Sequence, residues 1–435
     1  VCSRYSDIVH RLLSTQAVIT RGFPMVSSGL LILFFAFRAE AGRMLAGSGR
    51  HMIQRNSRVE ALQTAAGDPL DALDEGFTDM ATHVGFNADE LLDKNGVPVL
   101  HSRVRSYLEL LTRQQQKHLP ATPPIVPSRA TALQNSLDCT GSFWSGKRAT
   151  PAKLVHLLHV AFEIDVLEVV LHELNDTVDE FVIYEGIYTH RGGPKPTIFK
   201  NYAGRFEPFL PKIRHYIQTE EEAGKAPSDD YTSGDPWVNE NIPRLMAYKR
   251  YEQEVQLRGE SLDNTVFLTG DIDELPPAEA VNRFKHCATE NFPAAFYTVM
   301  YGTDMEHVQV LQDGCGPFGC GYWTQPTMIK AGGPLRHSRE HMYPEMVGAH
   351  LHARDPMASL AKQISVAEMR PITIQNTTEL LAPYHLQRKI ACEHAAPLTL
   401  ADEWKSKQWV PWLLTLDRRR FPYMWPSEFQ TYSCT

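Results

Sequence analysis

The chain has 435 residues, which is enough for two or three domains. Its hydrophobic content of 43% is ordinary for a soluble globular protein with a real core. The net charge of −8, without any run of five Lys or Arg residues, argues against nucleic acid as a main partner.

The segment between Arg21 and Arg38 carries no charge. Residues 22–37 are fewer than the ~20 residues that a spanning helix needs. The segment is therefore a short signal-anchor, a cleaved signal peptide whose apolar part starts near Met25, or a buried helix. Basic residues outnumber acidic ones ahead of it, so an anchored chain would keep its N-terminal tail in the cytoplasm. We assign residues 1–40 to a signal-anchor region.

A polar region of mixed composition follows at residues 41–150. Apolar residues at helical spacing predict an amphipathic helix from about Val99 to Lys117. Residues 119–128 are rich in proline and predict an extended linker. We therefore expect a poorly structured stem over 41–150, a boundary near residue 150 and a folded domain over residues 151–430.

From Lys153 onward, short apolar runs alternate with segments of helical periodicity. The apolar runs predict strands at residues 154–162, 181–184, 213–217, 266–268, 296–301 and 327–329. The periodic segments predict helices at residues 164–174, 237–257, 278–287 and 355–368. Strands that alternate with helices indicate an α/β fold with a mainly parallel sheet flanked by helices.

Three carboxylates follow the strand predicted at residues 266–268, namely those of Asp271, Asp273 and Glu274. In open α/β sheets, ligands bind beyond the carboxyl ends of the strands. Two aspartates separated by one residue suit a hard divalent cation, because such ions prefer oxygen ligands. A solvated acidic turn is the alternative, since the pattern is short and common.

Seven cysteines are too few for a disulfide scaffold in a chain of this length. Cys315 and Cys320 lie close together between glycines, as a small disulfide loop or as two free thiols. As half of a zinc site they are weak, because no second pair of Cys or His residues has matching spacing.

Five short blocks occur in a fixed order along residues 155–425. They are Phe162–Phe199 with its Gly-Pro-Lys-Pro, then Trp237 with Glu240 and Arg244, then Gly270–Pro276, then Gly348–His350, and finally Pro411 with Arg420–Tyr423. Each block is short, but the order is specific, and the chain resembles glycosyltransferase family 17. The first 150 residues share nothing identifiable with that family beyond the position of an anchor and a stem.

The resemblance implies a GT-A-like fold and an enzyme that moves N-acetylglucosamine from UDP-GlcNAc to a β-linked mannose of N-glycans. It implies an inverting reaction assisted by Mn²⁺ or Mg²⁺, with a nucleotide-sugar donor and a glycoprotein acceptor as partners. It also implies a type II protein of the Golgi membrane with its catalytic domain in the lumen. Two other functions stay open: a non-catalytic glycan-binding protein on a transferase-like domain, and a metal-dependent phosphoesterase.

The resemblance assigns the metal to Asp271 and Asp273, with His350 as a third ligand. A structural histidine is the alternative for His350, because a lone histidine is more often structural. An inverting transfer also needs a general base that deprotonates the acceptor hydroxyl. The sequence leaves four acids open for this role: Asp273, Glu274, Asp304 and Glu345.

Nucleotide binding is expected from Asp271 and from three further residues. Glu185 ends a predicted strand, where it would bind uracil or ribose or else be an exposed charge. Glu240 and Arg244 share one helix face with Trp237. Arg244 would then pair with a phosphate or, as a surface salt bridge, with Glu240.

Overall fold

The computed structural model describes residues 69–92, 98–224, 236–309, 322–335, 340–366, 377–395, 399–400 and 409–429. These residues belong to one compact unit that extends from Gly67 to Thr435. Within this described part of the chain, no helix is both long and apolar enough to cross a membrane. The signal-anchor region expected at residues 1–40 and the pair Cys315 and Cys320 lie outside the described residues.

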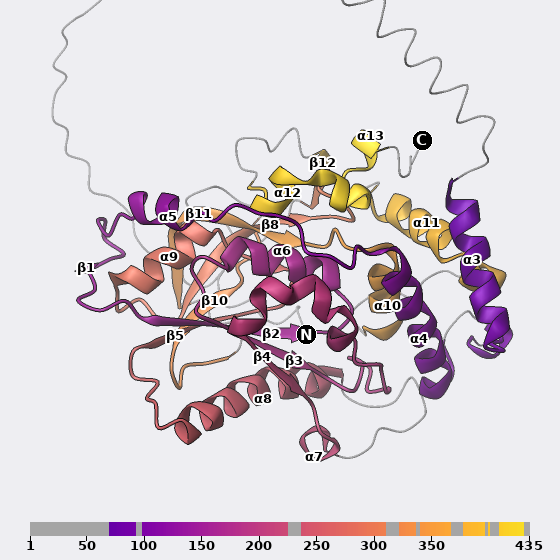
Figure 1. Ribbon diagram of the computed structural model, residues 1–435, viewed down its shortest axis with the longest axis horizontal. Helices are drawn as coiled ribbons and strands as arrows, with labels where there is room; N and C mark the ends of the chain where they lie inside the picture. Colours follow the sequence, from indigo (N-terminus) through magenta and orange to yellow (C-terminus); the bar gives the residue numbers. More distant parts are fainter. Residues whose placement is uncertain are drawn as a thin grey trace, which may run out of the picture. The chain divides into compact units, whose positions relative to one another are not determined.

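A mixed sheet forms the centre of the described unit (Figure 1). Its strands follow one another in the spatial order β12 (Thr399–Leu400), β9 (His307–Gln309), β8 (Ala294–Tyr301), β10 (Thr327–Lys330), β5 (Thr265–Thr269), β2 (Lys153–Val160), β3 (Glu180–Glu185) and β4 (Ile213–Ile217). β11 (His341–Leu351) runs parallel to β8 and pairs with the short strand β6 (Glu274–Leu275). The four neighbouring strands β5, β2, β3 and β4 are mutually parallel, which confirms the expected α/β class. In the other half of the sheet, β10 is antiparallel to β5 and β8, and β9 is antiparallel to β8.

Helices cover both faces of the parallel strands (Figure 1). α6 (Ile164–Leu174), α9 (Ala278–His286) and α12 (Trp412–Leu416) lie on one face, and α8 (Pro236–Leu257) lies on the other. Side chains alternate along a strand, so Leu158 of β2 packs in the core with α6 while Val155 and Leu157 pack with α8. Strands buried on both faces are apolar throughout their length, which is why the sequence predicted them.

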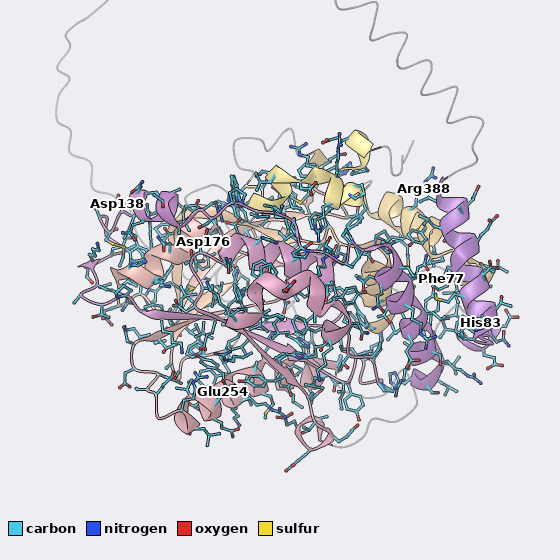
Figure 2. All side chains as sticks on the ribbon, in the orientation of Figure 1. Phe77, His83, Asp138, Asp176, Glu254 and Arg388 are labelled. Carbon is cyan, nitrogen blue, oxygen red and sulfur yellow. A yellow bond between two sulfur atoms is a disulfide. The ribbon has the colours of Figure 1, made fainter. Side chains whose placement is uncertain are left out.

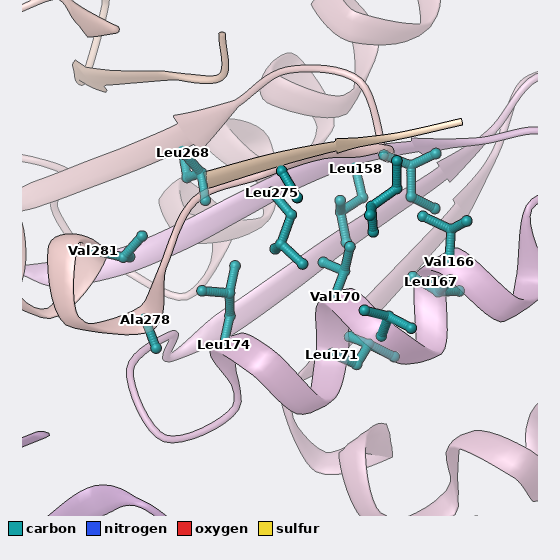
Figure 3. Close-up of a cluster of buried hydrophobic side chains, with 14 of the residues drawn as sticks. Leu158, Val166, Leu167, Val170, Leu171, Leu174, Leu268, Leu275, Ala278 and Val281 are labelled. Atoms are coloured by element: carbon teal, nitrogen blue, oxygen red, sulfur yellow. The ribbon is translucent and has the colours of Figure 1, made fainter. Parts of the chain in front are cut away.

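Figure 3 shows the core between α6 and the sheet. Val166, Val170 and Leu174 lie at helical spacing on α6 and are fully buried in the same cluster as Leu158 of β2 and Leu268 of β5. This packing fixes β5 firmly against its neighbours. The acidic turn that follows β5 is therefore held in a defined position relative to the rest of the sheet.

Helices from opposite ends of the described chain form a second core. They are α3 (Pro69–His83), α4 (His101–His118), α10 (Pro356–Ser365) and α11 (Pro383–Ala395). Phe77, labelled on α3 in Figure 2, packs edge-on against Tyr107 of α4, with ring centroids 6.1 Å apart. Phe162, which follows β2, is buried in this second core and so joins it to the sheet.

The compact unit begins earlier than the boundary expected near residue 150. Leu119 and Leu133, from the region expected to be a stem, are buried in the main core. Cys139 from the same region forms a disulfide with Cys287 at the end of α9. Local sequence patterns do not reveal these contacts, because the partners lie far along the chain.

The other elements connect or cap these layers. They are α5 (Ala130–Asn135), α7 (Glu220–Ala223), α13 (Pro426–Phe429), the two-stranded sheet of β1 (Gly146–Lys147) and β7 (Cys287–Ala288), and the 3₁₀ helices η1 (Ala88–Glu90), η2 (Phe199–Lys212), η3 (Thr377–Leu381), η5 (Arg418–Arg420) and η6 (Pro422–Met424).

Candidate active site

A cleft of about 330 Å³ opens at the carboxyl ends of β2, β3 and β5. The end of β11, the first turn of α8 and the last turn of α10 complete its walls. Parallel strands bring their carboxyl ends to one edge, so the acidic turn after β5 lies where the sequence predicted a ligand site. Of the expected site residues, Asp271, Asp273, Glu240 and His350 line this cleft.

Asp273, His350 and His352 come together with the spacing of metal ligands. One potential ligand atom from each residue lies within 4.8 Å of the other two, and His350 Nε2 is 3.6 Å from Asp273 Oδ1. β11 pairs with β6 opposite Glu274, and the Leu351 N–H donates to the Asp273 carbonyl at 2.6 Å. The two histidines are separated by one residue, so they emerge on the same side of the strand.

The chemistry of these donors fits a divalent cation. His350 Nδ1 is buried and has no hydrogen-bond partner among the described residues. Burial and the neighbouring His350 and Arg354 hold the pKa of His352 well below its ordinary value. The His352 imidazole is therefore neutral and keeps the lone pair that a ligand needs. A carboxylate with two imidazoles suits Mn²⁺ and related first-row cations better than Mg²⁺.

Three charged side chains, of Lys362, Arg354 and Glu163, surround Asp273 at the buried end of this cluster. Lys362 Nζ is 2.9 Å and Arg354 Nη2 is 3.2 Å from Asp273 Oδ2. Burial alone would raise the pKa of Asp273, but Lys362 and His350 hold it well below its ordinary value. Glu163 Oε1 lies 3.5 Å from Arg354 and 3.6 Å from Lys362, so two carboxylates and two cations alternate here. Asp273 is consequently ionised and rigidly held.

Asp271 lies at the rim of the cleft, apart from the cluster of Asp273 with the two histidines. Its side chain is 43% exposed and pairs with Arg244 of α8, which also binds Glu240 Oε1 at 2.5 Å. His190 Nε2 is 3.3 Å from the other oxygen of Glu240. Burial alone would raise the pKa of Glu240, but His190 and Arg244 lower it to about 2. Glu240 and Arg244 lie on one face of α8, as their spacing predicted. Together with Asp271 they form one charged wall of the cleft.

Lys195 places a buried ammonium group in the wall of the cleft. Its Nζ lies over the Phe162 ring, 5.4 Å from the centroid, and has no hydrogen-bond partner among the described residues. Burial lowers the pKa of Lys195, although Glu185 and Glu163 oppose the change. An unpaired ammonium is costly to bury. An anionic ligand in the cleft would offset that cost.

Glu185 ends β3 as predicted, but its side chain turns into the protein. Its Oε1 accepts hydrogen bonds from the backbone N–H groups of Ile198 and Phe199 at 2.7 and 3.0 Å. Its Oε2 is 2.7 Å from His215 Nε2. The carboxylate is fully buried and does not line the cleft. It holds the start of the segment η2 in place, and Lys195 occupies the cleft wall near it.

The expected general bases lie in different places. Glu274 is buried beneath the acidic turn, where it accepts from Trp323 Nε1 at 2.6 Å and from the Asp271 N–H at 2.8 Å. It does not cap α9, whose N-cap is Pro277. Glu345, near the middle of β11 and five residues before His350, pairs with Arg283 and does not line the cleft.

Asp304, also considered as a base, is buried and lies 2.8 Å from His307 Nδ1. Of the four acids, only Asp273 lines the cleft.

The sequence did not identify His352, Lys195 or Lys362 as site residues. His352 follows His350 at the spacing of one strand face, but the polar residues of β11 gave no strand prediction there. Lys195 lies within the Gly-Pro-Lys-Pro of the first of the five blocks. Lys362 is an ordinary helix residue until α10 is placed against the acidic turn, so no local signal marks it.

Residues 115–302 match the family model described as Glycosyltransferase family 17, which confirms the expected resemblance. The β-1,4-mannosyl-glycoprotein 4-β-N-acetylglucosaminyltransferases of Homo sapiens and Rattus norvegicus are each 28% identical to this chain over 155 residues. That alignment covers 34% of this chain and 27% and 26% of the two relatives, so the match spans about a quarter of their length. The family match at residues 115–302 includes the acidic turn and ends before β11.

Among solved structures, a mannosyltransferase from Pyrobaculum calidifontis in complex with GDP-Man and Mn²⁺ covers 76% of this chain and 95% of its own. It is 12% identical, and the TM-score of 0.26 is too low to carry an argument about ligands.

Proposed function

We propose that this protein transfers N-acetylglucosamine from UDP-GlcNAc to a β-linked mannose of N-glycans, with inversion, because residues 115–302 match the model of glycosyltransferase family 17. The proposal takes its donor and acceptor from the names of the relatives. The observation that carries it is the cluster of Asp273, His350 and His352 beside the unpaired ammonium of Lys195 in one cleft. Such a site suits a nucleoside diphosphate with its divalent cation.

The residues of the cleft have separable roles in this proposal. A divalent cation held by Asp273, His350 and His352 would act as a Lewis acid on the diphosphate. Lys195 and Lys362 present ammonium groups that stabilise the negative charge on the departing UDP. Arg354 and Lys362 keep Asp273 ionised and in place. The wall of Asp271, Arg244 and Glu240, held together by its own ion pairs, would bound the donor in the same cleft.

We also propose that the catalytic domain works in the lumen of the Golgi, attached through residues 1–40. The disulfide between Cys139 and Cys287 supports an oxidising compartment, because such bonds are rare in the cytosol. Residues 41–66 would then serve as a stem ahead of the compact unit that starts at Gly67.

The full chain, purified with Mn²⁺, would be incubated with a panel of UDP-sugars and an N-glycan acceptor. We expect UDP release to be fastest with UDP-GlcNAc and the product to carry a new β-linked residue, seen by NMR. Asp273→Asn should lose at least about 100-fold of this activity, because changing a group that only orients a metal ligand already costs about 10- to 100-fold, and this substitution changes the ligand itself. Asp263→Asn, in an exposed loop, is the matched control and should keep full activity.

Two results would contradict the transferase and indicate a different function. Hydrolysis of simple phosphate esters at a rate that depends on Asp273, without any sugar transfer, would identify a phosphoesterase. Binding of the N-glycan without UDP release from any sugar nucleotide would identify a glycan-binding protein on a transferase-like domain.

A further inference from the structure

A second cavity, of about 190 Å³, lies between α3, α10, α11 and the segment η6. Arg388 of α11, which lines it, is labelled in Figure 2. Much of its wall is aliphatic or aromatic, from Leu70, Leu73, Pro356, Tyr384, Pro422 and Tyr423. The cavity has the mixed apolar and polar lining that is typical of small-molecule sites.

Several polar groups in the wall are already paired. His118 binds Asp355 through Nε2, and its Nδ1 is 3.0 Å from the Tyr384 hydroxyl. The Tyr423 hydroxyl donates to Asp165 at 2.8 Å. These polar groups have their hydrogen bonds without a ligand, and the bonds hold this part of the wall rigid.

Two oxygen atoms in the wall have no partner among the described residues: Thr303 Oγ1 and Gln387 Oε1. The Gln387 side chain belongs to a residue that is only 8% exposed, and its Nε2 already donates to Ser359 Oγ at 2.8 Å. A buried polar atom without a hydrogen bond is destabilising. An amide oxygen can only accept, so the ligand that satisfies Gln387 must donate. A sugar hydroxyl does so, whereas a phosphate or carboxylate group does not.

The second cavity is connected to the cleft through Arg354, which contacts the cleft residue Asp273. This side chain lines the second cavity while its Nη2 reaches Asp273 at 3.2 Å. Thr303 lies just past the end of β8, and Met300 of the same strand lines the cleft. Two hollows connected by one side chain suit successive units of one oligosaccharide. We propose that the second cavity binds a neutral pyranose unit of the acceptor oligosaccharide, other than the mannose that receives the new sugar.

This assignment rests on the proposed function for its acceptor, and it names Thr303 and Gln387 as specificity-determining residues. The aromatic rings supply apolar surface for the faces of a pyranose ring, and the two unpaired oxygens supply hydrogen-bond sites for its hydroxyls. Recognition of a second unit would let the enzyme discriminate a branched glycan from a single mannoside.

The test compares the full chain with its Thr303→Val and Gln387→Leu variants. Binding of a trimannosyl N-glycan core and of methyl β-mannoside would be followed by saturation-transfer NMR and titration. Each substitution removes one neutral hydrogen bond, so we expect affinity for the trimannosyl core to fall about 3- to 10-fold. Affinity for the single mannoside should not change.

A stability measurement separates this role from a structural one. Thr303→Val removes a hydroxyl without a partner, so its melting temperature should equal or exceed that of the unsubstituted protein. Thr298→Val, the matched control on β8, removes a hydroxyl that donates to the Gln325 carbonyl at 3.1 Å and should lower the melting temperature.

UDP release is measured in parallel, so the two proposals fail separately. In one outcome, the unsubstituted protein releases UDP and both variants bind the trimannosyl core undiminished. That result overturns the second sugar site and leaves the transferase. Loss of trimannosyl binding in the variants, in a protein that never releases UDP, keeps the sugar site and overturns the transferase. Equal losses for the trimannosyl core and the single mannoside would also overturn the second site.

Discussion

Gly348→Ala tests how closely β11 must approach the acidic turn. A Cβ atom at Gly348 would lie 2.3 Å from the Leu275 carbonyl oxygen and 3.0 Å from Pro276 Cα. Both neighbours are backbone atoms of the segment that follows the turn, so neither can rotate away. Ordinary contact begins at 3.4 Å, so β11 and β6 must separate by 3.4 − 2.3 = 1.1 Å.

The separation acts directly on the candidate metal site. His350 is two residues beyond Gly348 on β11, and Asp273 is two residues before Leu275. Their potential ligand atoms, with those of His352, lie within 4.8 Å of one another. An opening of about 1 Å would spoil that arrangement. Misplacement on this scale costs about 100-fold in rate, and the overpacking should lower the free energy of unfolding by about 1–3 kcal/mol.

The assay is a calorimetric titration with Mn²⁺ in the presence of UDP, combined with thermal melting of each variant. Gly76→Ala is the matched control, because its Cβ meets nothing within 4 Å and lies in the middle of α3. That substitution should raise the free energy of unfolding by about 0.5–1 kcal/mol and leave Mn²⁺ binding unchanged. Wild-type Mn²⁺ affinity and an unchanged melting temperature in Gly348→Ala would refute the reasoning.

Three other predictions concern the cleft and the disulfide. Lys195→Met should raise the melting temperature, because it removes a buried ammonium without a partner among the described residues. It should also weaken UDP binding at least about 10-fold in titration. Equal UDP affinity in this variant would contradict the role of Lys195. Asp273→Asn should abolish Mn²⁺ binding in the same titration, while retention of the wild-type stoichiometry would count against this ligand. Replacing Cys139 and Cys287 by alanine opens a loop of 148 residues. The free energy of unfolding in urea should fall by roughly 2–5 kcal/mol. An unchanged midpoint of urea unfolding would show that the disulfide does not stabilise the domain.

Strands of the parallel half were predictable because most of them carry a short apolar run, as β3 does at residues 181–184 and β5 at residues 266–268. The predicted strand at residues 213–217 coincides with β4, and β3 and β5 differ from the prediction only at their ends. In contrast, β11 contains histidines, glutamate and proline and is only partly buried. Such a strand has no apolar run, so neither its existence nor the role of His352 follows from local sequence.

The second core was predictable only in part. The helix expected from Val99 to Lys117 is α4, and its apolar face follows from its periodicity. The helices that cover this face, α10 and α11, lie in distant parts of the chain. Which helix packs where depends on the fold of the whole domain, so local patterns contain no reason to include residues 69–135 in it.

Side-chain direction limited the prediction of the site. Glu185 and Asp271 both end parallel strands at the same edge, as expected. Glu185 nevertheless turns inward because two backbone N–H groups need an acceptor there. A sequence locates a strand end, but the direction of one side chain there depends on which buried groups need a partner.

Pulsed EPR of Mn²⁺ bound to the full chain together with UDP tests the central claim most directly. The account predicts hyperfine coupling to ¹⁴N of imidazole, from His350 and His352, and coupling to ³¹P of the diphosphate in the same spectrum. The imidazole coupling should weaken in His352→Gln and persist in His385→Gln, whose ring is outside the cleft. Mn²⁺ that shows coupling to phosphorus but none to nitrogen, or that does not bind at all, would contradict the assignment of this metal site.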